Sequence, residues 1–414
     1  MNFCPPENDT LPCPAPAGSV IPWEPSPAEL ALPAARTAGS VAQVGTKLLY
    51  VGGSDGTAPT TTTYITDVEN GTLAAWADGP ALPEARTAAA AAVVGSTVYL
   101  IGGTGSDGKA VDTIWALTYD QDAKTFGQWA PIDGFALPAA RSGTAAIPVS
   151  DGLLVVGGAG PDGTPQGTVW KSTIDAKGVL GAFSDQAALL DPVAGASMAQ
   201  VGDYVWVWGG TDANGPSGAV QRGTFGIPKT VETPAPDAVA VPEQLLGWAV
   251  SDGANMPPRS SAAGFSANGA LYALGGTDGS GPKNQLYWTI PTAKGEIDGW
   301  KHLDQTDLPA TGLVGGAAVV TGVNVFVIGG ETKDGAQTGS VRANLAPQEP
   351  FFQAGLVGVV VPALRIDGEI GQQLGYLSAA GAGTVNSVIL ILIGWAYAHP
   401  DTVRGWIDRR RRRG

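Results

Sequence analysis

Four arginines occupy the same place in a repeated motif of this 414-residue chain, and their spacing suits the binding of an anion. Three of them end a Leu-Pro-x-Ala-Arg segment, and the four are Arg36, Arg86, Arg141 and Arg259. A guanidinium pairs bidentately with a carboxylate, so four of them around one mouth of a repeat protein could hold an acidic ligand. The alternative, which we favour, is that each arginine bonds backbone carbonyls between repeats. The fourth and sixth repeats carry Ala194 and Thr311-Gly312 at this place.

Aspartates beside glycines are the second recurring group with chemical potential. Carboxylates of this kind bind calcium in some loops, but no run of several carboxylates accompanies them here. Asp-Gly is also a strong signal for a hairpin turn, and we assign these residues to turns. They are Asp55-Gly56, Asp107-Gly108, Asp162-Gly163, Asp212 to Gly215, Asp278-Gly279 and Asp334-Gly335.

Histidine and cysteine are scarce, which limits metal and nucleophile chemistry. The chain has two histidines, His302 and His399, and neither has another histidine near it in the sequence. Nothing supports a Ser-His-Asp arrangement built on His302. We therefore predict no metal site, no cofactor and no catalytic residue.

The elements that must position these residues form a repeat. Diglycines recur at intervals of about 50 to 66 residues, a period typical of propellers and arrays. Each follows a short apolar run such as Val-Tyr-Leu-Ile, which indicates a buried strand, and each run follows a glycine turn. Aromatic residues mark a third and a fourth strand, so each repeat predicts four antiparallel strands, one propeller blade. The diglycines are Gly52-Gly53, Gly102-Gly103, Gly157-Gly158, Gly209-Gly210, Gly275-Gly276 and Gly329-Gly330.

This pattern of a diglycine, an aromatic residue and a tryptophan resembles the kelch repeat. The resemblance covers about residues 20–346 and implies an all-β, six-bladed β-propeller over residues 21–346. The last repeat ends one strand short, and Ile21-Pro22-Trp23 precedes the first Leu-Pro motif. We therefore predict that an N-terminal strand completes the last blade, which leaves no open sheet edge.

Composition narrows the range of partners. The net charge is −14, and the only strongly basic segment is the C-terminal tail. An acidic body argues against nucleic acid and against anionic membrane surfaces as partners. Residues 1–20 are predicted to be an extended or disordered Pro-rich lead without a signal peptide. Cys4 and Cys13 in this lead either form a small disulfide loop or remain free thiols. The Pro-rich segment Pro228–Glu243 is predicted to be an exposed loop.

The region after the propeller is apolar and then basic. Residues 347–375 form a connector that contains Phe351–Leu364, too short to span a bilayer and either interfacial or packed on the propeller. Residues 376–398 carry no charge and are long enough for a transmembrane helix, with Tyr376 and Trp395 at its ends. The tail, residues 399–414, is basic.

Arginines beside a membrane span favour the cytoplasmic side. Arg404, Arg409 and Arg410 therefore place the tail inside and the propeller outside the cell. Because no signal peptide precedes the propeller, a tail-anchored protein of opposite orientation stays open, as does a hairpin in which Phe351–Leu364 enters the membrane.

Kelch propellers host unrelated activities, so the resemblance leaves the function open. We favour a membrane-anchored, cell-surface binding or scaffold module that presents the propeller to protein or glycan partners. The alternative is a membrane-tethered carbohydrate-active enzyme, similar to the kelch propellers of the sialic-acid mutarotase or epimerase type. An enzyme requires carboxylates and arginines that converge in a polar funnel, whereas a scaffold spreads its polar groups over loops or ties them to the backbone.

Overall fold

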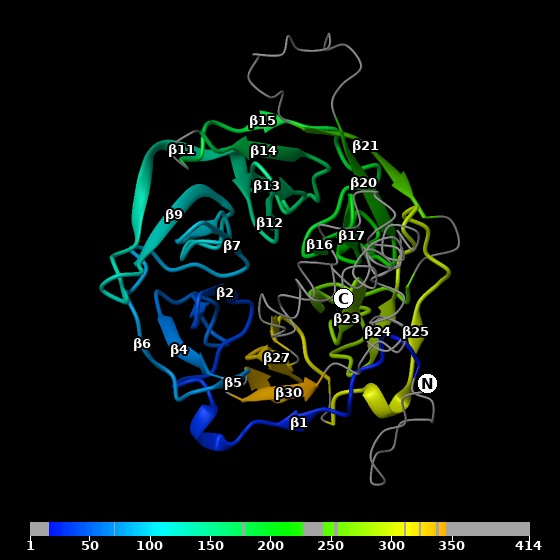
Figure 1. The fold of residues 1–414 in the computed structure, drawn as a ribbon, viewed down its shortest axis with the longest axis horizontal. Helices are drawn as coiled ribbons and strands as arrows, with labels where there is room; N and C mark the ends of the chain where they lie inside the picture. The colour runs from blue at the N-terminus through cyan, green and yellow to red at the C-terminus, as the bar shows by residue number, and fades with distance from the viewer. Residues whose placement is uncertain are drawn as a thin grey trace, which may run out of the picture. The chain divides into compact units, whose positions relative to one another are not determined.

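The protein is a β-propeller. The computed structural model describes residues 16–344, apart from 70, 176–178, 227–242, 252–255, 310–311, 323 and 337–338. The chain from Ser19 to Leu345 is one compact unit. Its sheets stand around a central axis and follow one another in chain order, from blue to orange in Figure 1. The helical segments among the described residues are two 3-10 turns, η1 (Ala28–Leu30) and η2 (Asp304–Thr306).

Each of the larger sheets is a meander of antiparallel strands, as the repeat predicted. The first sheet holds β2 (Ser40–Val44), β3 (Lys47–Val51), β4 (Thr63–Glu69), β5 (Thr72–Leu73) and β6 (Ala77–Asp78). The second holds β7 (Ala90–Val94), β8 (Thr97–Ile101), β9 (Val111–Asp120), β10 (Thr125–Phe126) and β11 (Ala130–Arg141). The third holds β12 (Ala145–Val149), β13 (Gly152–Val156), β14 (Val169–Thr173) and β15 (Ser184–Asp185).

The remaining sheets repeat the arrangement. The fourth holds β16 (Ser197–Val201), β17 (Tyr204–Trp208), β20 (Val220–Gly226) and β21 (Gln244–Val250). The fifth holds β22 (Ala263–Ala267), β23 (Ala270–Leu274), β24 (Leu286–Thr289) and β25 (Lys301–His302). The last holds β26 (Ala317–Thr321), β27 (Asn324–Ile328), β30 (Ser340–Asn344) and β1 (Glu24–Pro25). Two small ribbons pair β18 (Thr211–Asp212) with β19 (Gly215–Pro216), and β28 (Glu331–Thr332) with β29 (Gly335–Ala336).

The second strand of each sheet is apolar on both faces because it lies between two neighbouring sheets. In β3, Leu49 and Val51 pack in a cluster with the second sheet, including Leu100. Leu48 and Tyr50 pack in a different cluster, with residues of the last sheet. A strand buried on both faces has a continuous apolar run in place of the alternating pattern of a half-exposed strand.

The diglycines allow the main chains of neighbouring sheets to approach each other. At Gly102, φ is +58°, and a Cβ there would lie 2.5 Å from the carbonyl oxygen of Arg141, which leads into the next sheet. The amide of Gly103 donates to that same carbonyl at 2.8 Å. We call the residue that accepts this bond the lead residue of a sheet. All six diglycines make the bond, and their lead residues are Arg86, Arg141, Val193, Arg259, Leu313 and Arg36.

A closed ring of backbone hydrogen bonds links the segments that lead into the first strands, two residues before each strand begins. Each N–H donates to the carbonyl of the equivalent residue in the preceding sheet, with N···O distances of 2.7 to 3.3 Å. Every member has a positive φ, although three of them are not glycine. The ring passes through Ala38, Ala88, Gly143, Gly195, Ser261 and Gly315, and Ala38 donates to Gly315.

The N-terminal segment closes the propeller, as predicted. Glu24 and Pro25 of β1 pair with Arg342 and Val341 of β30, so the ladder lies slightly after the predicted Ile21-Pro22-Trp23. The Trp23 indole is 5% exposed, and its Nε1 donates to the Thr306 carbonyl at 2.8 Å.

Several predicted features lie outside the described residues. They are residues 1–15 of the lead, with Cys4 and Cys13, most of the Pro228–Glu243 loop, the connector 347–375, the membrane span 376–398 and the tail 399–414. The end of the predicted lead is instead packed on the propeller, since Ser19 and Val20 are fully buried. Within the described part of the chain, no helix has the length and apolar character needed to cross a membrane.

The space around the diglycines predicts that alanine lowers the free energy of unfolding more at Gly102 than at Gly95, although the two glycines have nearly equal φ. Gly95 has φ of +62° and open space around its Cβ position, so Gly95→Ala should cost only the backbone strain, about 1–2 kcal/mol. Gly102→Ala adds a clash with the Arg141 carbonyl and should lower the free energy of unfolding by about 1–3 kcal/mol more. Denaturant unfolding of both variants measures the difference. Equal losses would mean that the close approach to the lead carbonyl is not a constraint.

Candidate functional site

The four predicted arginines lie inside the sheets and not at an open mouth. Their exposed fractions are between 2% and 6%. In each, Nη1 donates to the carbonyl of the residue just before it, at 2.7 to 3.0 Å. Nη2 donates at 2.6 to 3.0 Å to an acceptor on or next to the third strand of the same sheet. These acceptors are the hydroxyls of Tyr64, Thr113 and Thr168 and the amide oxygen of Gln285.

Aromatic rings cover three of the guanidiniums. Arg141 lies 4.8 Å from the ring centre of Trp170, and Arg36 and Arg259 stack in the same way on Tyr64 and Tyr287. Burial lowers the pKa of Arg141, and the Asp162 carboxylate acts in the opposite direction. An arginine remains protonated under such conditions, so each side chain is an internal cation. Three are held by a carbonyl, a side-chain oxygen and a π face, whereas Arg86 has no aromatic partner among the described residues and pairs with the Glu84 carboxylate at 3.0 Å.

Two details of the sequence prediction need correction. The guanidiniums bond carbonyls within their own segment, and the main-chain carbonyl of each lead residue makes the bond between sheets. The positions equivalent to the arginines in the fourth and sixth repeats are Val193 and Leu313, not Ala194 and Thr311-Gly312. Without an arginine to mark the lead residue, the sequence left the register ambiguous by one or two residues.

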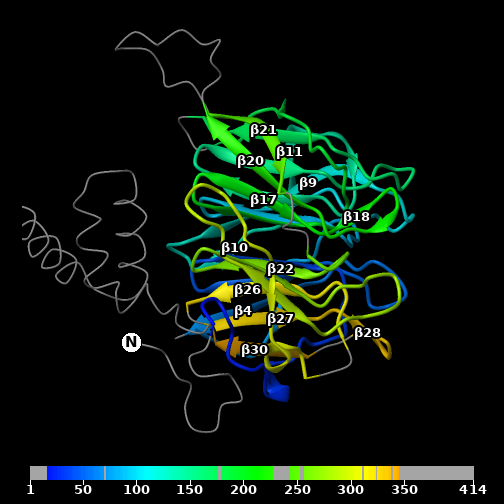
Figure 2. The same cartoon turned by 90° about the vertical axis from the view of Figure 1, so that its right-hand side faces the viewer.

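The predicted Asp-Gly segments are turns. Asp55 Oδ1 accepts the amides of Thr57 and Ala58 at 2.8 and 2.9 Å, and the Thr57 hydroxyl at 2.6 Å. Asp162 and Asp278 make similar bonds to the second residue after them. These turns connect second and third strands, so they gather on one face, where β18 and β28 lie in Figure 2. We call it the turn face.

The hydrogen bonds keep the turn-face carboxylates ionised in acid. The Thr57 hydroxyl and then the Ala58 and Thr57 amides lower the pKa of Asp55 from 3.8 to about 2. Bonds from Thr164 lower the pKa of Asp162, and those from Lys283 and Ser280 lower the pKa of Asp278. These three carboxylates are therefore ionised over the physiological pH range, and that of Asp278 is paired with Lys283 Nζ at 2.8 Å.

The axial channel offers no acid–base pair among its lining residues. Its cavity of about 250 Å³ is lined by the first strands of all the sheets with alanine, glycine, serine, valine and methionine. Representative lining residues are Ser40, Ala90, Ser197 and Gly264. An enzyme of the mutarotase type would need carboxylates and arginines directed into such a funnel.

A second cavity, of about 490 Å³, lies between the third and fourth sheets on the face opposite the turn face. Its lining includes the carboxylates of Asp203 and Glu243 and the polar groups of Ser150, Gln200 and Thr224. Among the described residues that line it there is no lysine or arginine, and this part of the lining suits a neutral hydrogen-bonding ligand or a cation better than an anion.

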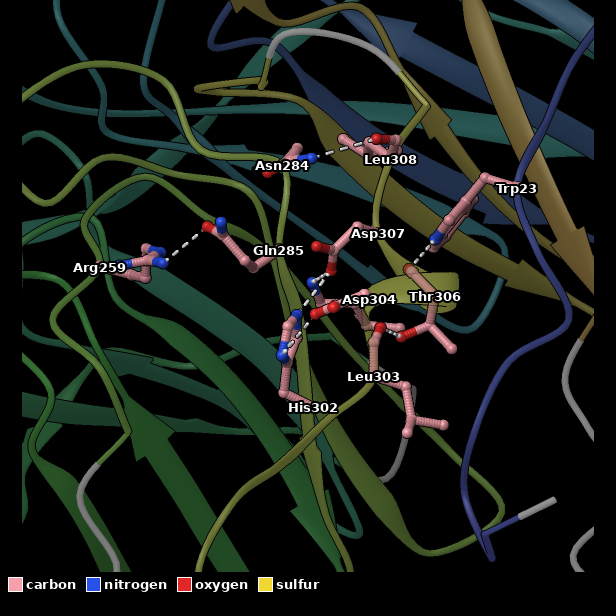
Figure 3. Close-up of polar contacts among 11 residues, drawn as sticks. Trp23, Arg259, Asn284, Gln285, His302, Leu303, Asp304, Thr306, Asp307 and Leu308 are labelled. Carbon is pink, nitrogen blue, oxygen red and sulfur yellow. Dashed lines mark hydrogen bonds and ion pairs between the residues drawn. The ribbon is translucent and has the colours of Figure 1, made fainter. Parts of the chain in front are cut away.

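A histidine–carboxylate cluster lies at the end of β25, where the sequence had predicted no metal site. His302, Asp304 and Asp307 bring one ligand atom each to within 4.8 Å of one another. Figure 3 shows both carboxylates beside the His302 ring, with Nε2 2.9 Å from Asp307 Oδ1 and Nδ1 3.7 Å from Asp304 Oδ1. Its signal in the sequence is the pair of carboxylates two and five residues after His302, which involves no second histidine.

Comparison with known proteins supports the fold. The solved structure titled "Structure of YjhT" matches with a TM-score of 0.58 and 17% sequence identity, over 75% of this chain and 95% of that one. No protein-family model and no curated protein matches the chain. At this identity the likeness establishes the β-propeller fold.

The turn geometry predicts how one carboxylate titrates. Because the folded-state pKa of Asp55 lies below 3.8, its ionised form stabilises the fold above about pH 4, and this contribution is lost as the pH falls through about 2. Thr57→Val removes the largest cause of the shift and should move the titration midpoint of Asp55 upwards. NMR titration of the carboxyl carbon measures the midpoint. An unchanged midpoint would show that the backbone amides alone set it.

Proposed function

We propose that the chain is a six-bladed kelch-type propeller that acts as a binding or scaffold module for protein or glycan partners. The regular diglycine repeat and the β-propeller fold support this assignment. In this proposal, the segment 376–398 anchors the propeller to a cell membrane and the basic tail lies in the cytoplasm.

The burial of the four arginines is the observation that carries the proposal. Each guanidinium has its Nη donors occupied by the carbonyls and side chains of its own sheet. Arginines held in this way stabilise the blades and are not available to polarise a substrate. Polar groups tied to the backbone or spread over turns are typical of a scaffold, not of a catalytic funnel.

The turn face is the surface that we propose for recognition. Its carboxylates stand on exposed turns in several sheets and remain ionised well below neutral pH. A face of this charge favours a partner that presents lysines, arginines or amino groups. Long-range attraction of this kind raises association rates and weakens with salt.

A charge-neutralised variant tests this surface. We expect the full chain to bind an immobilised oligolysine peptide in low salt, and the triple variant Asp55→Asn, Asp162→Asn, Asp278→Asn to bind at least tenfold more weakly. Asparagine keeps one oxygen that accepts the turn amides, so the fold should persist, although Asp278→Asn loses the ion pair with Lys283. The matched control neutralises Glu69, Asp122 and Glu296, which lie on or near connections between third and fourth strands, and should bind like the parent. An equal loss of affinity in the turn-face variant and the control variant would show that binding depends on net charge alone and not on the turn face.

The same samples distinguish the enzyme alternative. NMR of N-acetylneuraminic acid measures how fast its anomers exchange, and the full chain should leave the rate at its buffer value. An exchange rate that increases in proportion to protein concentration would overturn the scaffold proposal and support an enzyme of the mutarotase type.

The proposed orientation predicts a specific proteolysis pattern. Protease added to intact cells should digest the propeller and leave an epitope tag on the C-terminal tail intact, because the tail is inside. Lysed cells provide the control in which both are cut. Protection of the propeller until lysis would instead place it in the cytoplasm.

A further inference from the structure

We infer that His302 and Asp304 form a binding site for a divalent transition-metal ion such as Zn²⁺, with Asp307 as the residue that orients the histidine. The site lies where β25 leads into η2, and Figure 3 shows the three side chains together. It is separate from the turn-face carboxylates and from both cavities.

Asp307 fixes the histidine ring. Its Oδ1 accepts the backbone N–H of Leu286 at 3.0 Å and lies 2.9 Å from His302 Nε2. The Asp307 side chain is only 15% exposed. A carboxylate can only accept, so the hydrogen in the contact with His302 belongs to the imidazole. In the neutral ring, Nε2 is therefore the donor and Nδ1 presents a lone pair.

That lone pair faces a second acceptor. Nδ1 lies 3.7 Å from Asp304 Oδ1, beyond hydrogen-bond distance. Two acceptors gain nothing from each other unless a cation lies between them. Two ligand atoms on a tetrahedral zinc ion are about 3.3 Å apart, so a small side-chain rotation brings both into coordination.

The surroundings match the needs of such a site. Ligating histidines commonly donate their other ring nitrogen to a carboxylate, which is the place of Asp307 here. The Asp304 side chain is 94% exposed, which leaves an open approach and room for water as the remaining ligands.

Metal at this site would stabilise the closure of the propeller. Asp304 begins η2, and the Thr306 carbonyl in the same turn accepts the indole N–H of Trp23 at 2.8 Å. The Thr306 side chain is buried, and its hydroxyl bonds the Leu303 carbonyl at 2.7 Å. An ion that links His302 to Asp304 would therefore hold the turn to which the N-terminal segment is attached.

Calorimetry with zinc chloride tests the site in untagged, full-length protein. Cys4→Ser, Cys13→Ser and His399→Gln form the background, so that His302 is the one histidine left and no thiol competes. We expect one Zn²⁺ per chain, and at least tenfold weaker binding in His302→Ala and in Asp304→Asn. Asp307→Asn should weaken binding by about 10–100-fold and keep the stoichiometry. Asp133→Asn, an exposed carboxylate on another sheet, should bind like the background protein.

Two further readouts make the result decisive. Zinc should raise the Tm of the background protein and leave that of His302→Ala unchanged. Co²⁺ should give a visible absorption band that requires His302. Absence of zinc binding at millimolar concentration would overturn the inference. It would also be overturned if His302→Ala and Asp304→Asn bound zinc as tightly as the background protein. Because Asp304 is almost fully exposed, its variant keeps the test valid even if His302→Ala is unstable.

Discussion

The close main-chain contact between neighbouring sheets is the constraint on which the propeller depends. At each diglycine the second amide donates to the carbonyl of the next lead residue, and the first glycine leaves the space that a Cβ would fill. This contact sets the distance between sheets at the turn face. The ring through Ala38 and Ala88 sets it near the axis, where the residues just before adjacent first strands are joined by one hydrogen bond for each pair of sheets. Small side chains on those first strands follow from the same closeness, since a narrow axis has no room for large ones.

The hydrogen bond between a diglycine and the lead-residue carbonyl also affects where the charged side chains lie. Because the carbonyl of Arg141 is committed to Gly103, the side chain extends over its own sheet, against Trp170 and Thr168. A buried guanidinium is tolerable only if its donors are met, and a carbonyl, a hydroxyl and an aromatic face meet most of them. The aspartates lie at turn tips, where water and backbone amides stabilise the ionised form. Each such repeat thus places an arginine inside the sheet and an aspartate on an exposed turn. This separation explains why carboxylates gather on the turn face.

Much of the fold could be predicted from the sequence, because every repeat carries the same short signals for turns and buried strands. The diglycines, the apolar second strands and the Asp-Gly turns are each found where the patterns placed them. The closing N-terminal strand is present as predicted, but its ladder begins at Glu24, one residue after the predicted segment. The lead residues Val193 and Leu313 could not be located, since a main-chain carbonyl has no side-chain signature. The positive φ of Ala38 and Ser261 was equally hidden, because the inter-sheet ring imposes it against local preference. The cluster at His302 depends on a 3-10 turn that brings two carboxylates back towards the ring.

Closure of the propeller depends on more than the terminal ladder. β1 pairs over only two residues, and backbone hydrogen bonds contribute about 1 kcal/mol each, too little to hold a chain end. Val20 and Trp23 are buried in a cluster with the fifth and last sheets, and burying side chains of this size contributes about 1.5–3 kcal/mol each. The indole bond to Thr306 then directs this burial to one place. The turn after His302 is therefore part of the closure, and whatever orders that turn also stabilises the joined ends of the ring.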